Sequence, residues 1–384
     1  MLGGLRREQP PRVARAAENV NAAATAGRGG RLLVPGIVRN VEDSVGSGGP
    51  LLPVRVEPAR AVWRQDLADA FRNPADLGRF LGLPPAVIAE AGVSTAGFPF
   101  LVPRGFAARM RRGDPLDPLL LQVLPRAAET SAVAGYAADP LAEATFLAAP
   151  GLVHKYRGRA LVLVTGGCAV NCRYCFRREF PYGASGATRR GIDQALAAVA
   201  ADDSLTEVIL SGGDPLLVDD DELTTIIERL EAIPHVRRLR IHSRLPVVLP
   251  SRIDEGLVAA LAQSRLARVV VIHANHPAEL DDTVAVAVRR LAGLPAVVLN
   301  QAVLLRGVND SPAVLASLCE RLVEIGVVPY YLHLLDRVRG AAQFEVSEAE
   351  ARQLHRVLRE TLPGYAVPRL VREIPGERSK TGLA

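Results

Sequence analysis

Lysine is almost absent from this chain. Of its 46 basic residues, only Lys155 and Lys380 are lysines, and the others are arginines. A compositional bias toward arginine explains the shortage, and the two lysines either remain by chance or do something that arginine cannot. A lysine amine can lose its proton and add to an aldehyde, whereas a guanidinium stays protonated. Lys155 and Lys380 are therefore candidates for such chemistry.

The chain also lacks the features of several classes of protein. No apolar run is long enough to span a membrane, and no secretory signal is visible. The net charge of +5 is modest and the basic residues are scattered, which argues against a nucleic-acid-binding surface. Only four cysteines occur in 384 residues, which suits a reducing compartment. The sequence predicts a cytoplasmic protein with neither a membrane nor a nucleic acid as partner.

Three of the four cysteines gather in the stretch GGCAVNCRYCFRR. Cys168, Cys172 and Cys175 follow an apolar run, residues 160–165, that predicts a buried strand. An odd number of thiols disfavours disulfides, and structural zinc sites usually take four ligands. Iron–sulfur clusters take cysteines at such close spacing, and three of them leave one iron of a four-iron cluster open to an outside ligand. The spacing thus favours a [4Fe-4S] cluster over zinc or inert thiols.

The chain divides into regions of different pattern. Residues 1–60 are rich in Ala, Gly, Arg and Pro without a sustained period, which predicts a disordered extension, with a transit peptide as the weaker alternative. Residues 61–150 show helical apolar spacing and predict a helical region. Residues 151–340 alternate between strand and helix patterns, and residues 341–384 hold a last helix and a tail.

The alternating region predicts an α/β fold with parallel strands and crossover helices. Strands are expected at 161–165, 208–211, 239–243, 269–273, 297–303 and 328–334. Helices are expected at 191–200, 221–232, 254–263, 280–292, 312–325 and 347–360. Such units build either a partial barrel or an open sheet, and the pattern alone does not separate the two. In both folds, functional residues lie at the carboxyl ends of the strands.

Several side chains suited to chemistry follow these strands. They are Gly212, Gly213 and Asp214 after the second strand, His242 and Arg244 after the third, His273 and His276 after the fourth, Gln301 in the fifth and Asp336 after the sixth. Paired glycines let a ligand approach the backbone closely, an arginine suits a phosphate, and a carboxylate suits an ammonium group. Two histidines without a third ligand make a weak metal site, so a structural role is favoured for His273 and His276. His242 either lines a site or packs.

The spacing Cys-x-x-x-Cys-x-x-Cys, with the aromatic Tyr174 before the last cysteine, resembles the radical S-adenosylmethionine (radical SAM) superfamily. From about Trp63 to Ala384 the sequence resembles the lysine 2,3-aminomutase family, in particular the branch that makes (R)-β-lysine for elongation factor P. The resemblance rests on blocks in the family's order: DPLLLQVLP, PGLVHKYRGRALVLVTGGCAVNCRYCFRREFPY, SGGDPL, RLRIHSRLPVVLPSRI, LNQAVLLRGVND, PYYLHLLDRVRGAAQF and SKT. It implies a partial (β/α)6 radical SAM barrel with an N-terminal helical region.

The same resemblance implies three cofactors and the residues that bind them. Three cysteines, Cys168, Cys172 and Cys175, are expected to hold the [4Fe-4S] cluster. The loop of Gly212, Gly213 and Asp214 is expected to contact S-adenosyl-L-methionine. Lys380, in the tail, is expected to be the catalytic lysine that forms a Schiff base with pyridoxal 5′-phosphate (PLP). The other PLP contacts that the resemblance implies are Lys155, Tyr156, Arg244 and Gln301.

The resemblance also implies a substrate and an activity. Arg177 is expected to pair with the substrate carboxylate, and Asp336 and Glu373 with the ε-ammonium of L-lysine. Glu373 stands where better-known aminomutases have aspartate. The implied enzyme is an isomerase, an L-lysine 2,3-aminomutase that converts α-lysine to β-lysine, with flavodoxin or ferredoxin as reductant and the elongation factor P lysylation system as user.

Three alternatives to this activity stay open at the level of the sequence. An aminomutase could act on arginine or glutamate, although the acidic pair disfavours glutamate. A radical SAM enzyme could work without PLP. A non-catalytic iron–sulfur or zinc-binding module would leave the Gly-Gly-Asp loop, Arg177 and Lys380 unexplained.

Overall fold

The computed structural model describes residues 61–93 and 97–384. The extension predicted for residues 1–60 lies outside the described residues. Among those that are described, no helix combines the length and the apolar character that a membrane crossing requires.

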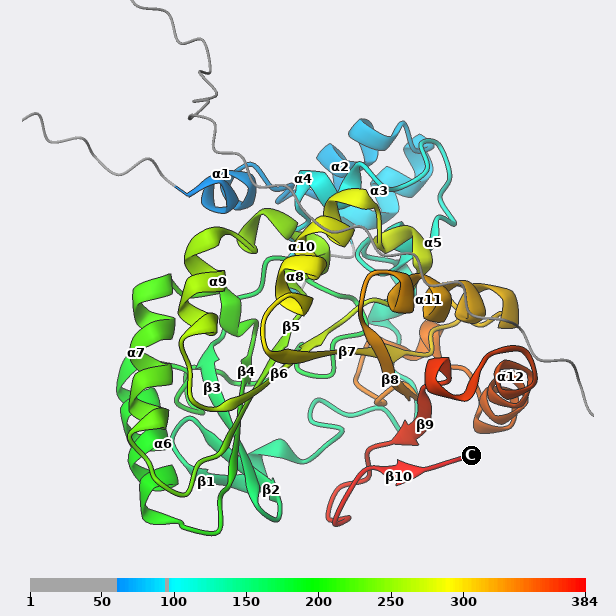
Figure 1. Ribbon diagram of the computed structural model, residues 1–384. Helices are drawn as coiled ribbons and strands as arrows, with labels where there is room; N and C mark the ends of the chain where they lie inside the picture. The colour runs from blue at the N-terminus through cyan, green and yellow to red at the C-terminus, as the bar shows by residue number, and fades with distance from the viewer. Residues whose placement is uncertain (1–60, 94–96) are drawn as a thin grey trace, which may run out of the picture. The chain divides into compact units, whose positions relative to one another are not determined.

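A single ten-stranded sheet forms the centre of the fold (Figure 1). Its strands lie side by side in the order of the chain, from β1 to β10. All neighbours from β3 to β9 are parallel, while β1, β2 and β10 pair antiparallel at the two ends of the sheet. The strands are β1 (Leu147–Ala149), β2 (Leu152–Tyr156), β3 (Arg159–Thr165), β4 (Glu207–Gly212), β5 (Arg238–Ser243), β6 (Ala267–Ile272), β7 (Ala296–Val303), β8 (Val328–His333), β9 (Arg369–Arg372) and β10 (Thr381–Gly382).

This strand order identifies the fold as a partial barrel. In an open doubly wound sheet the strand order reverses at a switch point. Here each crossover leads to the next strand in the same direction, and right-handed crossovers then place all helices on one side of the sheet. Figure 1 shows these helices arranged around the outside of the strands. They are α6 (Arg189–Ala201), α7 (Asp220–Glu231), α9 (Glu255–Ala262), α10 (Asp282–Ala292), α11 (Pro312–Glu324) and α12 (Glu348–Thr361). The partial (β/α)6 barrel is therefore confirmed.

Several of the outer helices begin at a capping side chain. Thr188 accepts the N–H of Gly191 at the start of α6, and Asp281 accepts that of Val284 at the start of α10. At α12, Ser347 forms a capping box with Glu350. Because these caps satisfy N–H groups that the helix itself leaves free, they fix where each helix starts after its strand.

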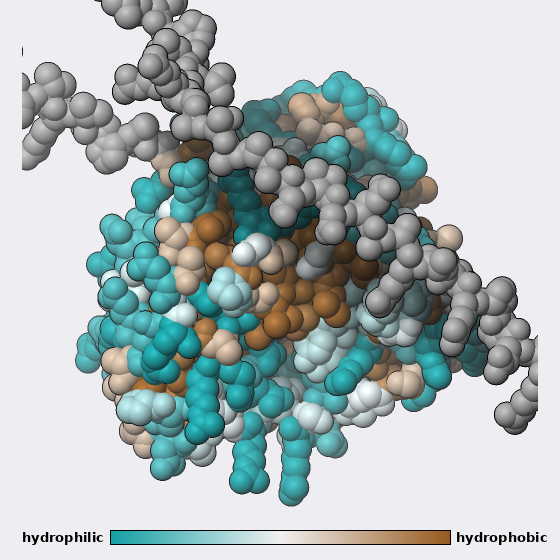
Figure 2. Space-filling view, viewed as in Figure 1, coloured by the Kyte–Doolittle hydropathy of each residue, from teal (hydrophilic) through white to brown (hydrophobic). Residues whose placement is uncertain are grey.

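The apolar core lies between the strands and the outer helices. Val162 and Leu210 from the strands and Leu196 and Leu230 from the helices are buried in one continuous cluster. In the view of Figure 1, apolar residues are concentrated at the centre of the visible face and hydrophilic residues surround them (Figure 2). The face of the strands that does not pack against these helices lines the interior of the barrel.

Short helices make up the region before the barrel. They are α1 (Val62–Ala68), α2 (Pro74–Leu81), α3 (Pro85–Val93), α4 (Arg104–Ala107) and α5 (Pro118–Leu121). The sequence predicted a helical region at residues 61–150, and these five helices lie within that range. Arg109 ties this region to the barrel, since its guanidinium donates to the carbonyl of Val247 at 2.7 Å.

The tail of the chain is held in the sheet. β9 pairs with β8, and β10 folds back to pair with β9, with Thr381 opposite Arg372. Leu383 is buried, and its N–H donates to the Leu370 carbonyl at 3.0 Å. The loop between β9 and β10, which carries Glu373 and Lys380, is therefore fixed at both of its ends.

Candidate active site

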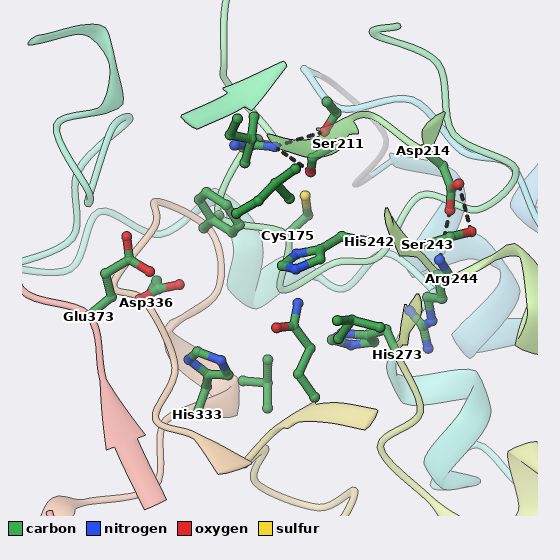
Figure 3. Close-up of a pocket in the computed structure, with 18 of the residues that line it drawn as sticks. Cys175, Ser211, Asp214, His242, Ser243, Arg244, His273, His333, Asp336 and Glu373 are labelled. Atoms are coloured by element: carbon green, nitrogen blue, oxygen red, sulfur yellow. Dashed lines mark hydrogen bonds between the residues drawn. The ribbon is translucent and has the colours of Figure 1, made fainter. Parts of the chain in front are cut away.

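A cavity of about 550 Å³ lies at the carboxyl ends of the barrel strands. Every residue to which the sequence analysis assigns a catalytic, cofactor, substrate or metal role lines this cavity: Lys155, Tyr156, Cys168, Cys172, Cys175, Arg177, Gly212, Gly213, Asp214, Arg244, Gln301, Asp336, Glu373 and Lys380. Figure 3 shows Asp336 and Glu373 together on one side, Asp214 and Ser243 on the other, and His242 between them.

The cysteine loop forms one wall of the cavity. Cys168, Cys172 and Cys175 are free thiols that line it together. Burial and the neighbouring thiols raise the pKa of Cys168, and burial and the charge of Cys172 raise the pKa of Cys175 to about 11. Three repelling thiolates need a positively charged partner, which the iron of a cluster supplies.

The thiol geometry is not that of a single-ion site. Within residues 61–93 and 97–384, no three His, Cys, Asp or Glu side chains are placed to hold one metal ion between them. A four-iron cluster takes each cysteine at a different iron, so its ligands stand further apart than those around one ion. The donor set therefore fits an iron–sulfur cluster better than a zinc ion.

The Gly-Gly-Asp loop after β4 packs directly on the cysteine loop. The N–H groups of Gly213 and Asp214 donate to the carbonyls of Thr165 and Gly167 at 2.6 and 2.7 Å. A Cβ on Gly213 would lie 2.0 Å from the Gly167 oxygen, and one on Gly212, whose φ is +122°, would lie 2.4 Å from the Thr165 oxygen. Only glycine allows the backbone to approach this closely.

The carboxylate of Asp214 is occupied within the protein. It accepts the Ser243 hydroxyl at 2.8 Å and the backbone N–H groups of Arg244, Leu216 and Leu245 at 2.7, 3.1 and 3.2 Å. Burial raises its pKa to about 6, against the effect of these hydrogen bonds. This geometry favours a role for Asp214 in tying the loop after β4 to the end of β5 over a direct contact with S-adenosylmethionine.

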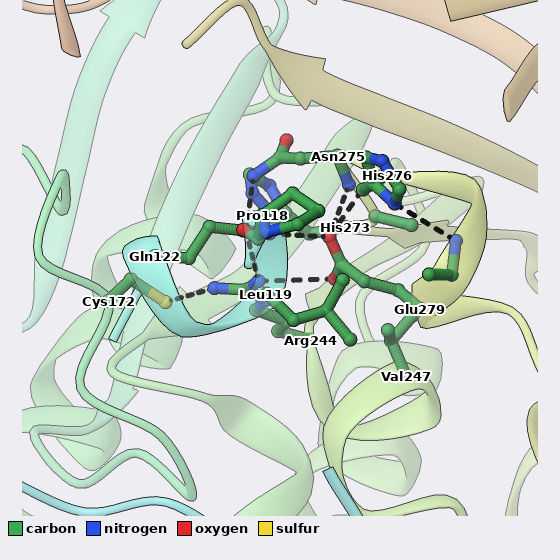
Figure 4. A network of polar contacts seen from close by, with 12 residues as sticks. Pro118, Leu119, Gln122, Cys172, Arg244, Val247, His273, Asn275, His276 and Glu279 are labelled. Atoms are coloured by element: carbon green, nitrogen blue, oxygen red, sulfur yellow. Dashed lines mark hydrogen bonds and ion pairs between the residues drawn. The ribbon is translucent and has the colours of Figure 1, made fainter. Parts of the chain in front are cut away.

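Arg244 faces the cysteine loop and not the lysines. Its guanidinium donates to the sulfur of Cys172, to Gln122 at 2.7 Å and to the fully buried Glu279 at 3.2 Å (Figure 4). The sequence analysis assigned Arg244 to the PLP phosphate. Its Nε has no hydrogen-bond partner and Arg244 lines the same cavity, so that assignment stays a prediction.

The same polar network holds the aromatic residue of the cysteine motif. The hydroxyl of Tyr174 accepts from Asn275 at 2.7 Å and lies 2.9 Å from a ring nitrogen of His273. The side chain of His276 accepts the N–H of Ala278 at 3.1 Å. Both histidines thus have structural contacts of the kind expected for them.

The two lysines of the chain meet at one carboxylate. The ammonium of Lys155 lies 3.0 Å from Glu373, and Lys380 donates to the other oxygen of the same carboxylate. Burial would raise the pKa of Glu373, but the charges of Lys380 and Lys155 lower it to about 2. Tyr156 packs beside this group, where burial and the charge of Glu373 raise the pKa of its phenol.

The pKa of Asp336, next to Glu373, is shifted in the opposite direction from that of Glu373. No described residue donates a hydrogen bond to its carboxylate, and burial together with the charge of Glu373 raises its pKa to about 7. A half-buried carboxylate without a bonded cation is a ready acceptor for an ammonium group from a ligand.

Arg177 is buried and held by a residue that sequence reasoning missed. Glu143 accepts from its Nε at 2.6 Å and from its Nη2 at 2.9 Å, and the same carboxylate lies 3.3 Å from the Nζ of Lys155. Glu143 belongs to η2 (Glu143–Phe146), a single helical turn that precedes β1. No motif of the sequence singles it out.

Histidines also line the cavity. His242 is neutral, since burial and the charge of Arg240 lower its pKa to about 3, and its Nε2 has no hydrogen-bond partner. His333 at the end of β8, another residue that sequence reasoning missed, is likewise neutral because burial lowers its pKa. Gln301 lies in β7, which stands in the sheet between β5, the strand of His242, and β8, the strand of His333. These two histidines and Gln301 give the cavity polar groups that carry no charge.

A family model and several known proteins match the chain over much of its length. The radical SAM superfamily matches residues 162–316. The L-lysine 2,3-aminomutase of Escherichia coli (strain K12) is 50% identical over 327 residues, which are 85% of this chain and 95% of that protein. The L-lysine 2,3-aminomutase of Haemophilus influenzae is 45% identical over 85% of this chain and 99% of that protein, and that of Clostridium subterminale is 39% identical over 70% and 64%. The chain therefore belongs to the lysine 2,3-aminomutase family of the radical SAM superfamily.

Proposed function

We propose that this protein is an L-lysine 2,3-aminomutase, an isomerase that moves the amino group of L-lysine from carbon 2 to carbon 3. The observation that carries the proposal is the composition of one cavity. Three thiols, a lysine amine and an acidic pair converge there from distant parts of the chain. Radical, PLP and substrate chemistry can then meet at one point, as an aminomutase requires.

The residues present fit the cofactors of this family. Cys168, Cys172 and Cys175 would hold the [4Fe-4S] cluster, and the loop of Gly212 and Gly213 would approach S-adenosylmethionine. Lys380 would hold PLP through its amine. When bound, the cluster with S-adenosylmethionine supplies a radical that removes a hydrogen atom, and PLP carries the migrating amino group.

Lys155 and Tyr156 would meet the phosphate of PLP. Lys155 offers a compact positive charge and Tyr156 a hydroxyl donor, both suited to phosphate oxygens. Gln301 would line the same cofactor. Arg244 would contribute its Nε, which has no hydrogen-bond partner, while its other nitrogens donate to Cys172, Gln122 and Glu279.

The charges of the cavity favour a substrate with an ammonium side chain. Asp336 and Glu373 lie together on one side of the cavity (Figure 3) and would accept the ε-ammonium of L-lysine. Arg177 would meet the α-carboxylate of the substrate. A glutamate side chain would face two carboxylates, so these charges disfavour it.

Cofactor loading prepares Glu373 for the substrate. In the structure, Glu373 binds the ammonium groups of Lys155 and Lys380. The phosphate of PLP would draw Lys155 away from Glu373, and the aldehyde of PLP would draw Lys380 away from it. The carboxylate then becomes free to accept the ammonium of lysine, so we expect PLP to bind before substrate.

The product is proposed to serve the modification of elongation factor P, with flavodoxin or ferredoxin as reductant, in the cytoplasm. This rests on the resemblance of the sequence to the branch that makes (R)-β-lysine.

A substrate panel tests the proposal. Anaerobically reconstituted protein receives PLP, S-adenosylmethionine, a reductant and L-lysine, L-arginine or L-glutamate, and products are resolved by chiral chromatography. We expect (R)-β-lysine from lysine and at most traces from the other two. The S product would contradict the elongation factor P assignment, and a preference for arginine or glutamate would contradict lysine as the substrate. Zinc without iron or sulfide in the protein would favour the non-catalytic module.

A further inference from the structure

Glu143 has no part in the function described so far, yet its carboxylate lines the cavity. The residue is 3% exposed. Its two oxygens accept from Nε and Nη2 of Arg177 at 2.6 and 2.9 Å, side by side, and the carboxylate lies 3.3 Å from the ammonium of Lys155. One buried group thus contacts both the cation proposed for the substrate carboxylate and the cation proposed for the phosphate.

Glu143 limits how Arg177 can meet a ligand. A guanidinium carries five N–H groups. Two of them donate to Glu143, and two on Nη1 donate to the hydroxyl of Ser211 at 3.2 Å and to the carbonyl of Gly212 at 3.1 Å. One N–H, on Nη2, is left for a ligand. Arg177 is therefore fixed in orientation before any substrate arrives.

The backbone before Glu143 is shaped to hold it in place. Ala142 has φ +49° and ψ +37°, and it is the one non-glycine residue with positive φ in residues 61–93 and 97–384. Such a conformation is strained for alanine and persists only where surrounding contacts maintain it. The carboxylate of Asp139 supplies these contacts, since it accepts the N–H groups of Glu143 at 3.0 Å and Ala144 at 3.2 Å.

We propose that Glu143 is a positioning residue that fixes Arg177 and Lys155 relative to each other, and so sets the distance between the carboxylate and phosphate subsites. Glu143 does not touch the substrate in this account. It presents the one free N–H of Arg177 to the α-carboxylate and keeps the guanidinium from turning toward the phosphate. The inference rests on the proposed function, because that function assigns the two subsites.

Ligands with and without a carboxylate test the inference. The dissociation constants of L-lysine and L-lysinamide are measured on PLP-loaded protein through the change in cofactor absorbance, for wild type and Glu143→Gln. We expect Glu143→Gln to weaken L-lysine binding about tenfold, roughly the contribution of one charge-assisted hydrogen bond, because a neutral amide no longer fixes Arg177. L-Lysinamide has an amide in place of the α-carboxylate, so its binding does not depend on Arg177. We expect its dissociation constant in Glu143→Gln to stay within about twofold of the wild-type value.

The matched control is Glu129→Gln. Glu129 is also buried and also pairs with arginines, Arg173 and Arg178, but it does not line the cavity. We expect this variant to lose thermal stability without any change in the ratio of the two dissociation constants. Equal weakening of both ligands in Glu143→Gln, or weakening of neither, overturns the inference. If Glu143→Gln does not fold, Glu143→Asp keeps the charge and must show the same selective loss to a smaller degree.

A ligand-free readout separates this inference from the proposed function. In a crystal structure of Glu143→Gln without ligands, we expect the guanidinium of Arg177 to leave Ser211 and Gly212. An unmoved guanidinium overturns the inference even if the enzyme makes β-lysine. A wild-type protein that binds neither PLP nor lysine refutes the proposed function, and the orientation of Arg177 in the variant still decides the role of Glu143.

Discussion

At the scale of single residues, the scarcity of lysine was the most informative feature of the composition. The two lysines lie far apart in the sequence, yet both bind Glu373 in the cavity. The chemistry that only an amine can perform predicted that Lys380 matters. It did not predict that both amines would bind Glu373, the carboxylate proposed to accept the ammonium group of the substrate.

Replacement of Lys380 tests its role in cofactor binding. We expect Lys380→Ala to lose the absorbance band of protein-bound PLP, because no other amine reaches the cofactor in the same way. Lys380→Arg is the matched control, since it keeps a cation beside Glu373 but cannot bind an aldehyde, and it should lose the band as well. Lys155→Arg should keep it, because either cation can meet a phosphate. A normal spectrum in Lys380→Ala would remove Lys380 from this role.

Asp336 makes lysine binding dependent on pH. Its pKa is raised to about 7, and only the ionised carboxylate attracts an ammonium group. We therefore expect the affinity for L-lysine to fall by up to about tenfold per unit as the pH drops below 7, with little change above pH 8. Asp336→Asn should bind lysine weakly at every pH and flatten the profile. An unchanged profile in this variant would show that another group titrates.

The carboxyl of Asp336 also makes the stability of the fold depend on pH. Stability falls as the pH rises, whereas the affinity for lysine increases. The pKa of this carboxyl rises on folding from 3.8 to about 7, so its protonated form favours the folded state below pH 4. This contribution is lost as the pH rises from 4 through 7. Ligand-free Asp336→Asn should therefore melt at a higher temperature than wild type at pH 8, with the gap closing toward pH 4. Melting curves at both pH values check the sign.

At the scale of elements, the sequence predicted the parts with a clear period and missed the short ones. The strand and helix patterns from β3 to α12 were identified within a few residues of their bounds. β1, β2, β9 and β10 were not, because strands of two to five residues carry too little alternation to be recognised. The pairing of β10 with β9 holds Lys380 over the barrel, and no local pattern indicates it.

The contact between the glycine loop and the cysteine loop gives a prediction at this scale. A methyl group on Gly213 would overlap the Gly167 oxygen at 2.0 Å, so Gly213→Ala should displace the cysteine loop. We expect this variant to retain less iron and sulfide after reconstitution. Gly183→Ala is the control, because a Cβ on Gly183 meets nothing within 4 Å. Equal iron content in the two variants would show that the packing of these loops does not shape the cluster site.

At the scale of the whole molecule, the resemblance supplied what the pattern left open. The alternation of strands and helices fitted both a partial barrel and an open sheet, and the order of strand pairing decides between them. That order depends on contacts between residues far apart in sequence, which a periodic pattern does not encode. The ion pairs of Glu143 and the contact of Arg244 with Cys172 escaped prediction for the same reason.

The most direct test of the account follows the nitrogen itself. Reconstituted wild-type protein is given L-lysine labelled uniformly with ¹³C and with ¹⁵N at the α-amino group, and the product is examined by NMR under anaerobic conditions. We expect the ¹⁵N label to become bonded to carbon 3 without a matching loss of S-adenosylmethionine, because an isomerisation returns to the product the hydrogen atom that the radical removes. Formation of 5′-deoxyadenosine while the label stays on carbon 2 would contradict the claim that this cavity moves the amino group of lysine.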